Sequence, residues 1–101
     1  KLKLIFLKLK KMTNKSDSGA GKINKKSVVF KTLYLIDDDF NSFDHVIDCL
    51  VAICDHSPIQ AEQSALLTHH KGRCDILKGE LEDLEPMKED LLLYGLYVEI
   101  I

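Results

Sequence analysis

The fold is decided by residues 36–50, IDDDFNSFDHVIDCL, in which three consecutive carboxylates separate a strand pattern from a helix pattern. Residues 28–36 before the carboxylates are rich in β-branched and aromatic side chains, which is typical of a strand. Asn41 or Ser42 can cap the helix that follows. Its apolar side chains have the i, i+3, i+4, i+7 spacing of one buried face. They are Phe43, Val46, Ile47, Leu50, Val51 and Cys54.

A second helix is marked by signals at both of its ends. Ser57 and Gln60 form a capping box, and Pro58 stands at the first helical position, where proline is favoured. We expect this helix to run to about His70 and to end at Gly72.

The remaining residues predict two more strands and a third helix. Residues 73–78 are typical of a strand, and residues 96–101 of a closing strand. The acidic helix between them can begin anywhere from Leu81 to Pro86 and ends at Gly95. The order β-α-α-β-α-β therefore predicts an α+β domain, with a three-stranded antiparallel sheet packed against three helices.

Length and charge limit the possible functions. The chain has 101 residues and is 46% apolar, enough for one small core. Its net charge of −2 is unevenly divided, because residues 1–31 carry +9 and residues 32–101 carry −11. The acidic part would repel a phosphate backbone, so we expect no nucleic-acid partner.

The cysteines and the apolar runs indicate the compartment. Cys49, Cys54 and Cys74 are odd in number, which favours free thiols in a reducing compartment. The apolar runs are far shorter than the roughly 20 residues of a membrane span. We therefore expect a cytoplasmic protein that does not enter a membrane.

Residues 1–27 are expected to be a disordered N-terminal leader to the domain at residues 28–101. Residues 1–11, KLKLIFLKLKK, begin without Met, and Met12 follows them, so they are expected not to be native. A signal peptide is an alternative, although the apolar core LIFL is shorter than the roughly seven residues required. A basic amphipathic surface strip is a third interpretation.

The acidic loop and a histidine near Gly72 have the chemistry of a cation site. Asp37 and Asp38 follow a strand, and an ammonium group needs fixed, preferably charged acceptors. A neutral His69 imidazole can accept one further hydrogen bond. Together with the apolar helix face, these groups could hold the N-terminus of a peptide that begins with a large apolar residue. The alternative is a solvated acidic loop that caps the helix.

The strings YLIDDDFNSFDHVIDCL, CDHSPIQAEQ and HHKGRC resemble the ClpS adaptor family over residues 28–101, and most closely its Bacteroidetes-type branch. ClpS proteins deliver substrates with destabilising N-terminal residues to a Clp-family AAA+ ATPase, which unfolds them into its protease. The resemblance implies a monomeric adaptor that is not an enzyme and uses no cofactor. Its substrates would begin with Leu, Phe, Tyr or Trp.

The resemblance also implies roles for particular residues. Asp37, Asp38 and His69 would bind the N-terminal ammonium. The family usually has Asn at the position of Asp37, and an ionised Asp cannot donate to the peptide carbonyl. We therefore expect the electrostatic attraction of the ammonium to be kept or strengthened. Binding of the peptide backbone is expected to be weakened.

Two further sets of residues follow from the same resemblance. The hydrophobic pocket would be lined by Asn41, Ser42, Phe43, Val46, Ala65, Leu66, Thr68 and Val98. Thr68 replaces a Val, so this pocket is expected to be slightly more polar. Docking to the ATPase would involve Glu82, Glu85 and Lys88.

Three other functions are alternatives to the adaptor function. Asp37, Asp38 and His69 could be an acid–base set, but the sequence has no nucleophile elbow, phosphate-binding glycine loop or cofactor motif. A metal site is a second possibility, although the spacing fits no standard zinc pattern. Its ligands would come from Cys54, His56, His69, His70 and Cys74. The third is a regulator that docks on the Clp ATPase without recognising N-termini.

Overall fold

The computed structural model describes residues 28–101, so the expectations for residues 1–27 fall outside the described part. Along the chain the elements are β1 (Phe30–Ile36), α2 (Phe43–Cys54), α3 (Pro58–Lys71), β2 (Arg73–Glu80), α4 (Leu81–Leu93) and β3 (Val98–Ile100). This order and the antiparallel sheet confirm the predicted α+β fold. None of the helices in residues 28–101 combines the length and apolar character that crossing a membrane requires.

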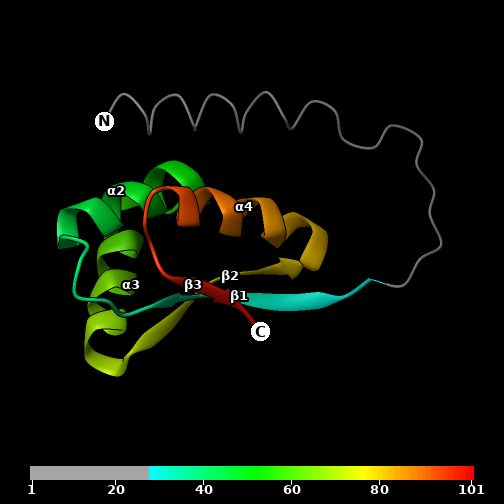
Figure 1. Cartoon of the computed structure of the whole chain (residues 1–101), viewed down its shortest axis with the longest axis horizontal. Helices are drawn as coiled ribbons and strands as arrows, with labels where there is room; N and C mark the ends of the chain where they lie inside the picture. Colours follow the sequence, from blue (N-terminus) through cyan, green and yellow to red (C-terminus); the bar gives the residue numbers. More distant parts are fainter. Residues whose placement is uncertain (1–27) are drawn as a thin grey trace.

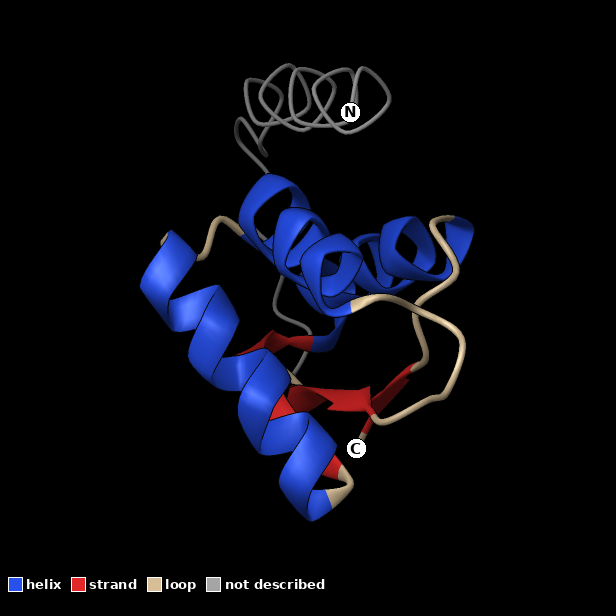
Figure 2. Ribbon diagram, turned by 90° about the vertical axis from the view of Figure 1, so that its left-hand side faces the viewer, coloured by secondary structure: helices blue, strands red, loops and turns tan. Residues whose placement is uncertain are grey.

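The sheet has the order β2-β1-β3, with β1 in the centre. Leu33 pairs with Leu77 on one side and with Ile100 on the other, while Leu35 pairs with Val98. The helices α2 and α4 lie over the sheet, and α3 packs alongside β2 (Figures 1 and 2). The central strand therefore ends next to the start of α2, which places the acidic loop at the edge of the helical layer.

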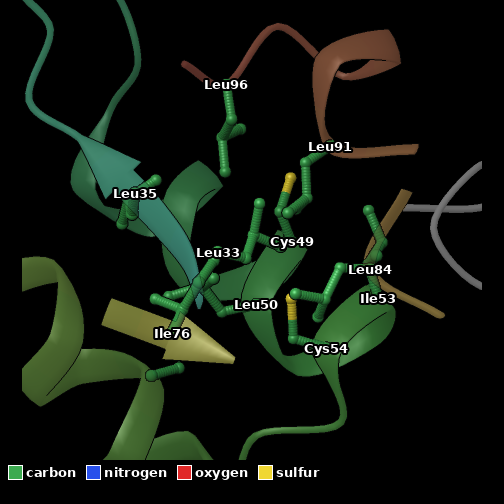
Figure 3. Close-up of a cluster of buried hydrophobic side chains, with 11 residues drawn as sticks. Leu33, Leu35, Cys49, Leu50, Ile53, Cys54, Ile76, Leu84, Leu91 and Leu96 are labelled. Atoms are coloured by element: carbon green, nitrogen blue, oxygen red, sulfur yellow. The ribbon is translucent and has the colours of Figure 1, made fainter. Parts of the chain in front are cut away.

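One apolar cluster joins the sheet to the helices. Leucines from β1, α2 and α4 converge on it, and Cys49 and Cys54 lie within it without forming a disulfide (Figure 3). Its members are Leu33, Leu35, Cys49, Leu50, Ile53, Cys54, Ala61, Ile76, Leu84, Leu91 and Leu96. Full burial of one large apolar side chain contributes about 1.5–3 kcal/mol. Of the predicted helix face, Leu50 and Cys54 belong to this cluster, Val46, Ile47 and Val51 pack against it, and Phe43 is exposed. Cys49 and Ile53 complete the buried face of α2.

The caps of α2 and α3 are those that the sequence predicted. The Ser42 hydroxyl accepts a hydrogen bond from the His45 N–H at 3.1 Å, and the Ser57 hydroxyl accepts one from the Gln60 N–H at 3.1 Å. Gly72 ends α3 with φ = 94°, in the left-handed region that glycine adopts without strain. Local side chains thus fix the ends of the two helices that flank the acidic loop and His69.

The later elements differ from the sequence prediction at their ends. The strand β2 extends two residues beyond the predicted end at Lys78, and α4 begins at once with Leu81. Glu80 forms no side-chain cap, but the Leu81 N–H donates to the Val29 carbonyl at 2.8 Å. Pro86 lies inside α4. The residue before β1 therefore accepts a hydrogen bond from the first residue of a helix that begins more than 50 residues later, a contact that no local signal reveals.

Candidate functional site

A surface pocket of about 560 Å³ opens where β1 ends, between α2 and α3. Its wall comes from the last residues of β1, the acidic loop, the first turns of α2 and the second half of α3. The lining residues are Leu35, Ile36, Asp37, Asp38, Asp39, Asn41, Phe43, Val46, Ala65, Leu66, Thr68 and His69. Residues distant in sequence are thus brought together around one opening.

The interior of the pocket is apolar. Leu35 forms part of it from the buried core, Val46 and Phe43 contribute from α2, and Ala65 and Leu66 contribute from α3. Phe43 and Leu66 remain exposed. A ligand that covered such side chains would gain about 25 cal/mol for each Å² of apolar surface removed from water. The interior is therefore suited to a large apolar group.

The rim of the pocket is polar and acidic. Asp37, Asp38 and Asp39 follow one another along it, and His69 stands across from them at the end of α3. The His69 Nδ1 atom lies 3.9 Å from the Asp37 Oδ1 atom, and both side chains are open to solvent. An exposed pair at this distance is weak, so both groups are available to a ligand.

Asp38 organises the loop that carries the rim. One oxygen of its carboxylate accepts hydrogen bonds from the Phe40 N–H at 2.7 Å and the Asn41 N–H at 2.8 Å. The other oxygen accepts from the Asn41 Nδ2 at 3.0 Å, and the same Nδ2 donates to the Gly95 carbonyl at 2.9 Å. Three of the roughly four acceptor positions of the carboxylate are thereby used within the loop. The loop is tied both to itself and to the turn after α4.

These bonds also affect the ionisation of Asp38. Partial burial alone would raise the pKa of this carboxyl, but the hydrogen bonds from Asn41 and Phe40 outweigh burial and lower the pKa. The carboxylate is therefore held in its charged form, next to the opening of the pocket.

All but two of the residues predicted to bind the ammonium or to form the hydrophobic pocket line this opening. The exceptions are Ser42, whose side chain caps α2, and Val98, which pairs with Leu35 in the sheet and packs against the core. Both were expected in the wall from the family resemblance. Their side chains are instead committed to the structure of the domain.

Three lining residues were not predicted. Leu35 and Ile36 are the last two residues of β1, and Asp39 is the third carboxylate of the loop. Asp39 could have been found from the run of three Asp in the sequence. Nothing in a period-2 strand pattern shows that both Leu35 and Ile36 border one opening. Most acceptor positions of the Asp38 carboxylate are occupied by hydrogen bonds within the loop. Asp39 therefore adds a carboxylate on the rim that can accept hydrogen bonds from a ligand.

Thr68 makes the pocket less polar than the sequence suggested. Its hydroxyl donates a hydrogen bond to the Ser64 carbonyl at 2.8 Å, one turn earlier in α3. A hydroxyl that is satisfied within its own helix offers no proton to a ligand. The threonine at this position therefore changes the wall less than its polarity implies.

The remaining predicted residues lie outside the pocket. Glu82 and Glu85 are exposed on α4, and Lys88 is half-buried on the same helix. In the described part of the chain, no group of three or more His, Cys, Asp or Glu side chains is placed to hold a metal ion. The cysteines and histidines weighed as metal ligands are thus not gathered into one site within residues 28–101.

Comparison with known proteins places this geometry in a family. A sequence model of the family described as ATP-dependent Clp protease adaptor protein ClpS matches residues 26–98. The ClpS2 protein of Agrobacterium tumefaciens, in its structure bound to L-phenylalaninamide, is similar with a TM-score of 0.68 and 16% identity. The match covers 74% of this chain and 100% of that one. A search of curated proteins found no match. The structural likeness shows a shared fold, and the family match over most of the chain shows that the protein belongs to the ClpS family.

Proposed function

We propose that this protein is an adaptor that binds the free N-terminus of polypeptides beginning with a large apolar residue and delivers them to a Clp-family AAA+ ATPase for degradation. The main support for this proposal is that one pocket combines an apolar interior with an acidic rim. The related ClpS2 is bound to L-phenylalaninamide, which presents an ammonium group beside an aromatic side chain. That ligand has the two chemical features that this pocket is equipped to hold.

The rim would hold the ammonium by charge-assisted hydrogen bonds. An N-terminal ammonium has three donors, and Asp37, Asp39 and neutral His69 offer acceptors around the opening. The Asp38 carboxylate keeps the loop in place and adds negative charge. Acetylation of the peptide would remove both the charge and two of the donors, so binding depends on a free N-terminus.

The interior would select the first side chain by size and apolar surface. A pocket of about 560 Å³ is large enough for Leu, Phe, Tyr or Trp. One methylene group is worth only about 1–3 kcal/mol, so these residues would be separated incompletely from one another. Small first residues such as Ala would leave the apolar wall in contact with water and bind weakly.

The proposed role of the pocket is binding rather than chemistry. Its lining includes one hydroxyl, that of Thr68, and this group donates to the Ser64 carbonyl instead of facing a base. The exposed carboxylates and His69 are accounted for as ammonium acceptors. Substrate cleavage is therefore assigned to the partner protease.

Binding of the N-terminus can be tested by fluorescence anisotropy with labelled peptides that differ only at their first residue. The set is Leu, Phe, Tyr, Trp, Met and Ala, with N-acetylated Phe as a control. We expect tight binding of the large apolar residues, loss on acetylation, and loss in His69→Ala. His70→Ala is the matched control, because His70 is an exposed neighbour that does not line the pocket. Equal, weak binding of all the peptides would refute recognition of N-termini.

Delivery to the ATPase is a separate step with its own test. The charged face of α4 that includes Glu82 and Glu85 is exposed and lies outside the pocket. We expect the double substitution Glu82→Lys and Glu85→Lys to reduce degradation of a Phe-initiated substrate by the Clp protease. Peptide binding measured without the ATPase should not change. An unchanged degradation rate would exclude this face from docking.

Asp37 favours a second candidate function. Because an ionised Asp cannot donate to the peptide carbonyl, the chain could dock on the ATPase and change its substrate choice without binding N-termini. The variant Asp37→Asn separates the two functions. Binding that appears only in the variant would identify a regulator, whereas binding by the natural protein supports the adaptor.

A further inference from the structure

We infer that the stacked rings of Phe40 and Tyr97 form a shelf beside the pocket that selects peptides with arginine at the second or third position. This inference rests on the proposed function, because the pocket must first hold the peptide by its first residue. It adds to that function a determinant of substrate choice outside the pocket.

The shelf adjoins the rim directly. Phe40 lies between Asp39 and Asn41, which both line the pocket. The Tyr97 carbonyl accepts a hydrogen bond at 2.8 Å from the N–H of Ile36, another lining residue. The two rings have centroids 6.4 Å apart and planes inclined by 16°. Segments more than 50 residues apart thus present one aromatic surface next to the pocket opening.

The rings are exposed although their backbones are held in place. Phe40 is 83% exposed and Tyr97 is 48% exposed. The Phe40 N–H donates to the Asp38 carboxylate, and the neighbouring Asn41 is tied to Gly95 two residues before Tyr97. The core cluster includes neither ring. The stack therefore offers an exposed aromatic face on an anchored backbone, which lowers the ordering cost of binding a ligand.

The charge around the shelf favours a cation. Residues 28–101 contain five basic and fifteen acidic side chains. Asp39 precedes Phe40 and lies on the rim, and Glu99 lies in β3, two residues after Tyr97. A cationic side chain over the rings would meet aromatic faces and nearby carboxylates together.

Arginine fits this surface better than lysine. A planar guanidinium stacks on aromatic faces and sheds its hydration more readily than an ammonium. The protein already makes such a contact, because the Arg73 guanidinium carbon lies 4.5 Å from the centre of the Tyr34 ring. Tyr34 pairs with Glu99 across β1 and β3. The contact between Arg73 and Tyr34 therefore combines an aromatic ring with a neighbouring carboxylate, as proposed for the shelf.

The second and third peptide residues are those that can reach the shelf. The first side chain occupies the pocket and the ammonium is held at the rim, so the chain must leave across the rim. An extended chain advances about 3.3–3.6 Å per residue, which keeps the next two residues close to the opening. Later residues would lie beyond the shelf.

The test uses fluorescence anisotropy with labelled peptides that begin with Phe and differ at position two or three. Those positions carry Arg, Lys, Ala, Phe or Glu, and all other residues are uncharged. The proteins are the natural chain, Phe40→Ala, Tyr97→Ala and the ring-preserving controls Phe40→Tyr and Tyr97→Phe. Because both rings are exposed, we expect every variant to fold, and circular dichroism checks this.

We expect Arg at one of the two positions to bind about fivefold more tightly than Ala, with Lys between them. Phe40→Ala and Tyr97→Ala should remove the advantage of Arg over Lys, while the ring-preserving controls keep it. The affinity of the Phe-initiated peptide with Ala at both positions should stay within about twofold in every variant, since neither ring lines the pocket.

Three outcomes would overturn the inference. Equal binding of the Arg and Ala peptides would show that the shelf selects nothing, while the pocket would stand. An advantage for Phe over Arg would show that the shelf takes apolar residues instead. If no peptide with a large apolar first residue binds, the proposed function fails and the shelf fails with it.

Discussion

The core and the pocket rim are built from neighbouring parts of β1 and α2, but they are held by different forces. The core packs many apolar side chains from both elements with those of α4. The rim depends on a few hydrogen bonds around Asp38 and Asn41. Damage to the core should therefore lower global stability, whereas damage to the rim should change binding first.

The largest expected effect is on thiol reactivity, which tests how closed the core is. Desolvation by burial, with a contribution from Asp48, raises the pKa of Cys49 to about 12. At pH 8 native Cys49 should react with iodoacetamide about a thousandfold more slowly than an unperturbed thiol. Cys74, which is only half-buried, should be labelled first. Mass spectrometry of partly labelled protein measures the order, and labelling of native Cys49 as fast as Cys74 would contradict a closed core.

Truncation in the core tests its contribution to stability. Leu50 is fully buried between the sheet and the helices, so Leu50→Ala should lower the free energy of unfolding by about 3 kcal/mol through lost burial and a cavity. Leu50→Met, which keeps the volume, should cost less than about 1.5 kcal/mol. Urea unfolding measures both variants. Equal losses would mean that the core does not depend on side-chain volume here.

Removal of the loop tether tests whether the rim controls binding. Asn41→Ala removes the bonds to Asp38 and Gly95 and should lower stability by about 1 kcal/mol. Ser42→Ala removes the cap of α2 at a similar cost of about 1 kcal/mol, but leaves the tether intact. We expect Asn41→Ala to weaken binding of a Phe-initiated peptide several-fold more than Ser42→Ala. Equal binding by the two variants would contradict a role of the loop tether in peptide binding.

The smallest expected effect is on acid stability. The pKa of Asp38 lies below its ordinary value of 3.8 in the folded protein, so its contribution to stability is fully present above that pH. The contribution is lost as the pH falls through the lower folded-state pKa. Asp38→Asn should therefore be less stable than the natural protein at neutral pH, and the difference should shrink below about pH 4. Urea midpoints at several pH values measure it, and a difference independent of pH would exclude this role of the carboxylate.

Much of the fold follows from local features of the sequence. The period of apolar residues predicts α2, Ser57 and Pro58 mark the start of α3, and Gly72 marks its end. These signals act between residues a few positions apart, so they can be recognised without a structure. For the same reason, the sequence places acidic residues and an apolar helix face on either side of one turn. Most of the predicted pocket residues come from these two segments and α3.

Tertiary structure decided what depends on contacts between distant residues. It starts α4 at Leu81 through the Val29 carbonyl, ties Asn41 to Gly95, and stacks Phe40 on Tyr97. It also turns Val98 toward the core and places Ile36 beside the pocket. Each of these features is set by strand register and chain reversal, and a change of one residue in register would redirect the side chains. Local patterns along the chain therefore predict the elements and the chemistry of the acidic loop, while packing across the fold sets which groups meet around the pocket.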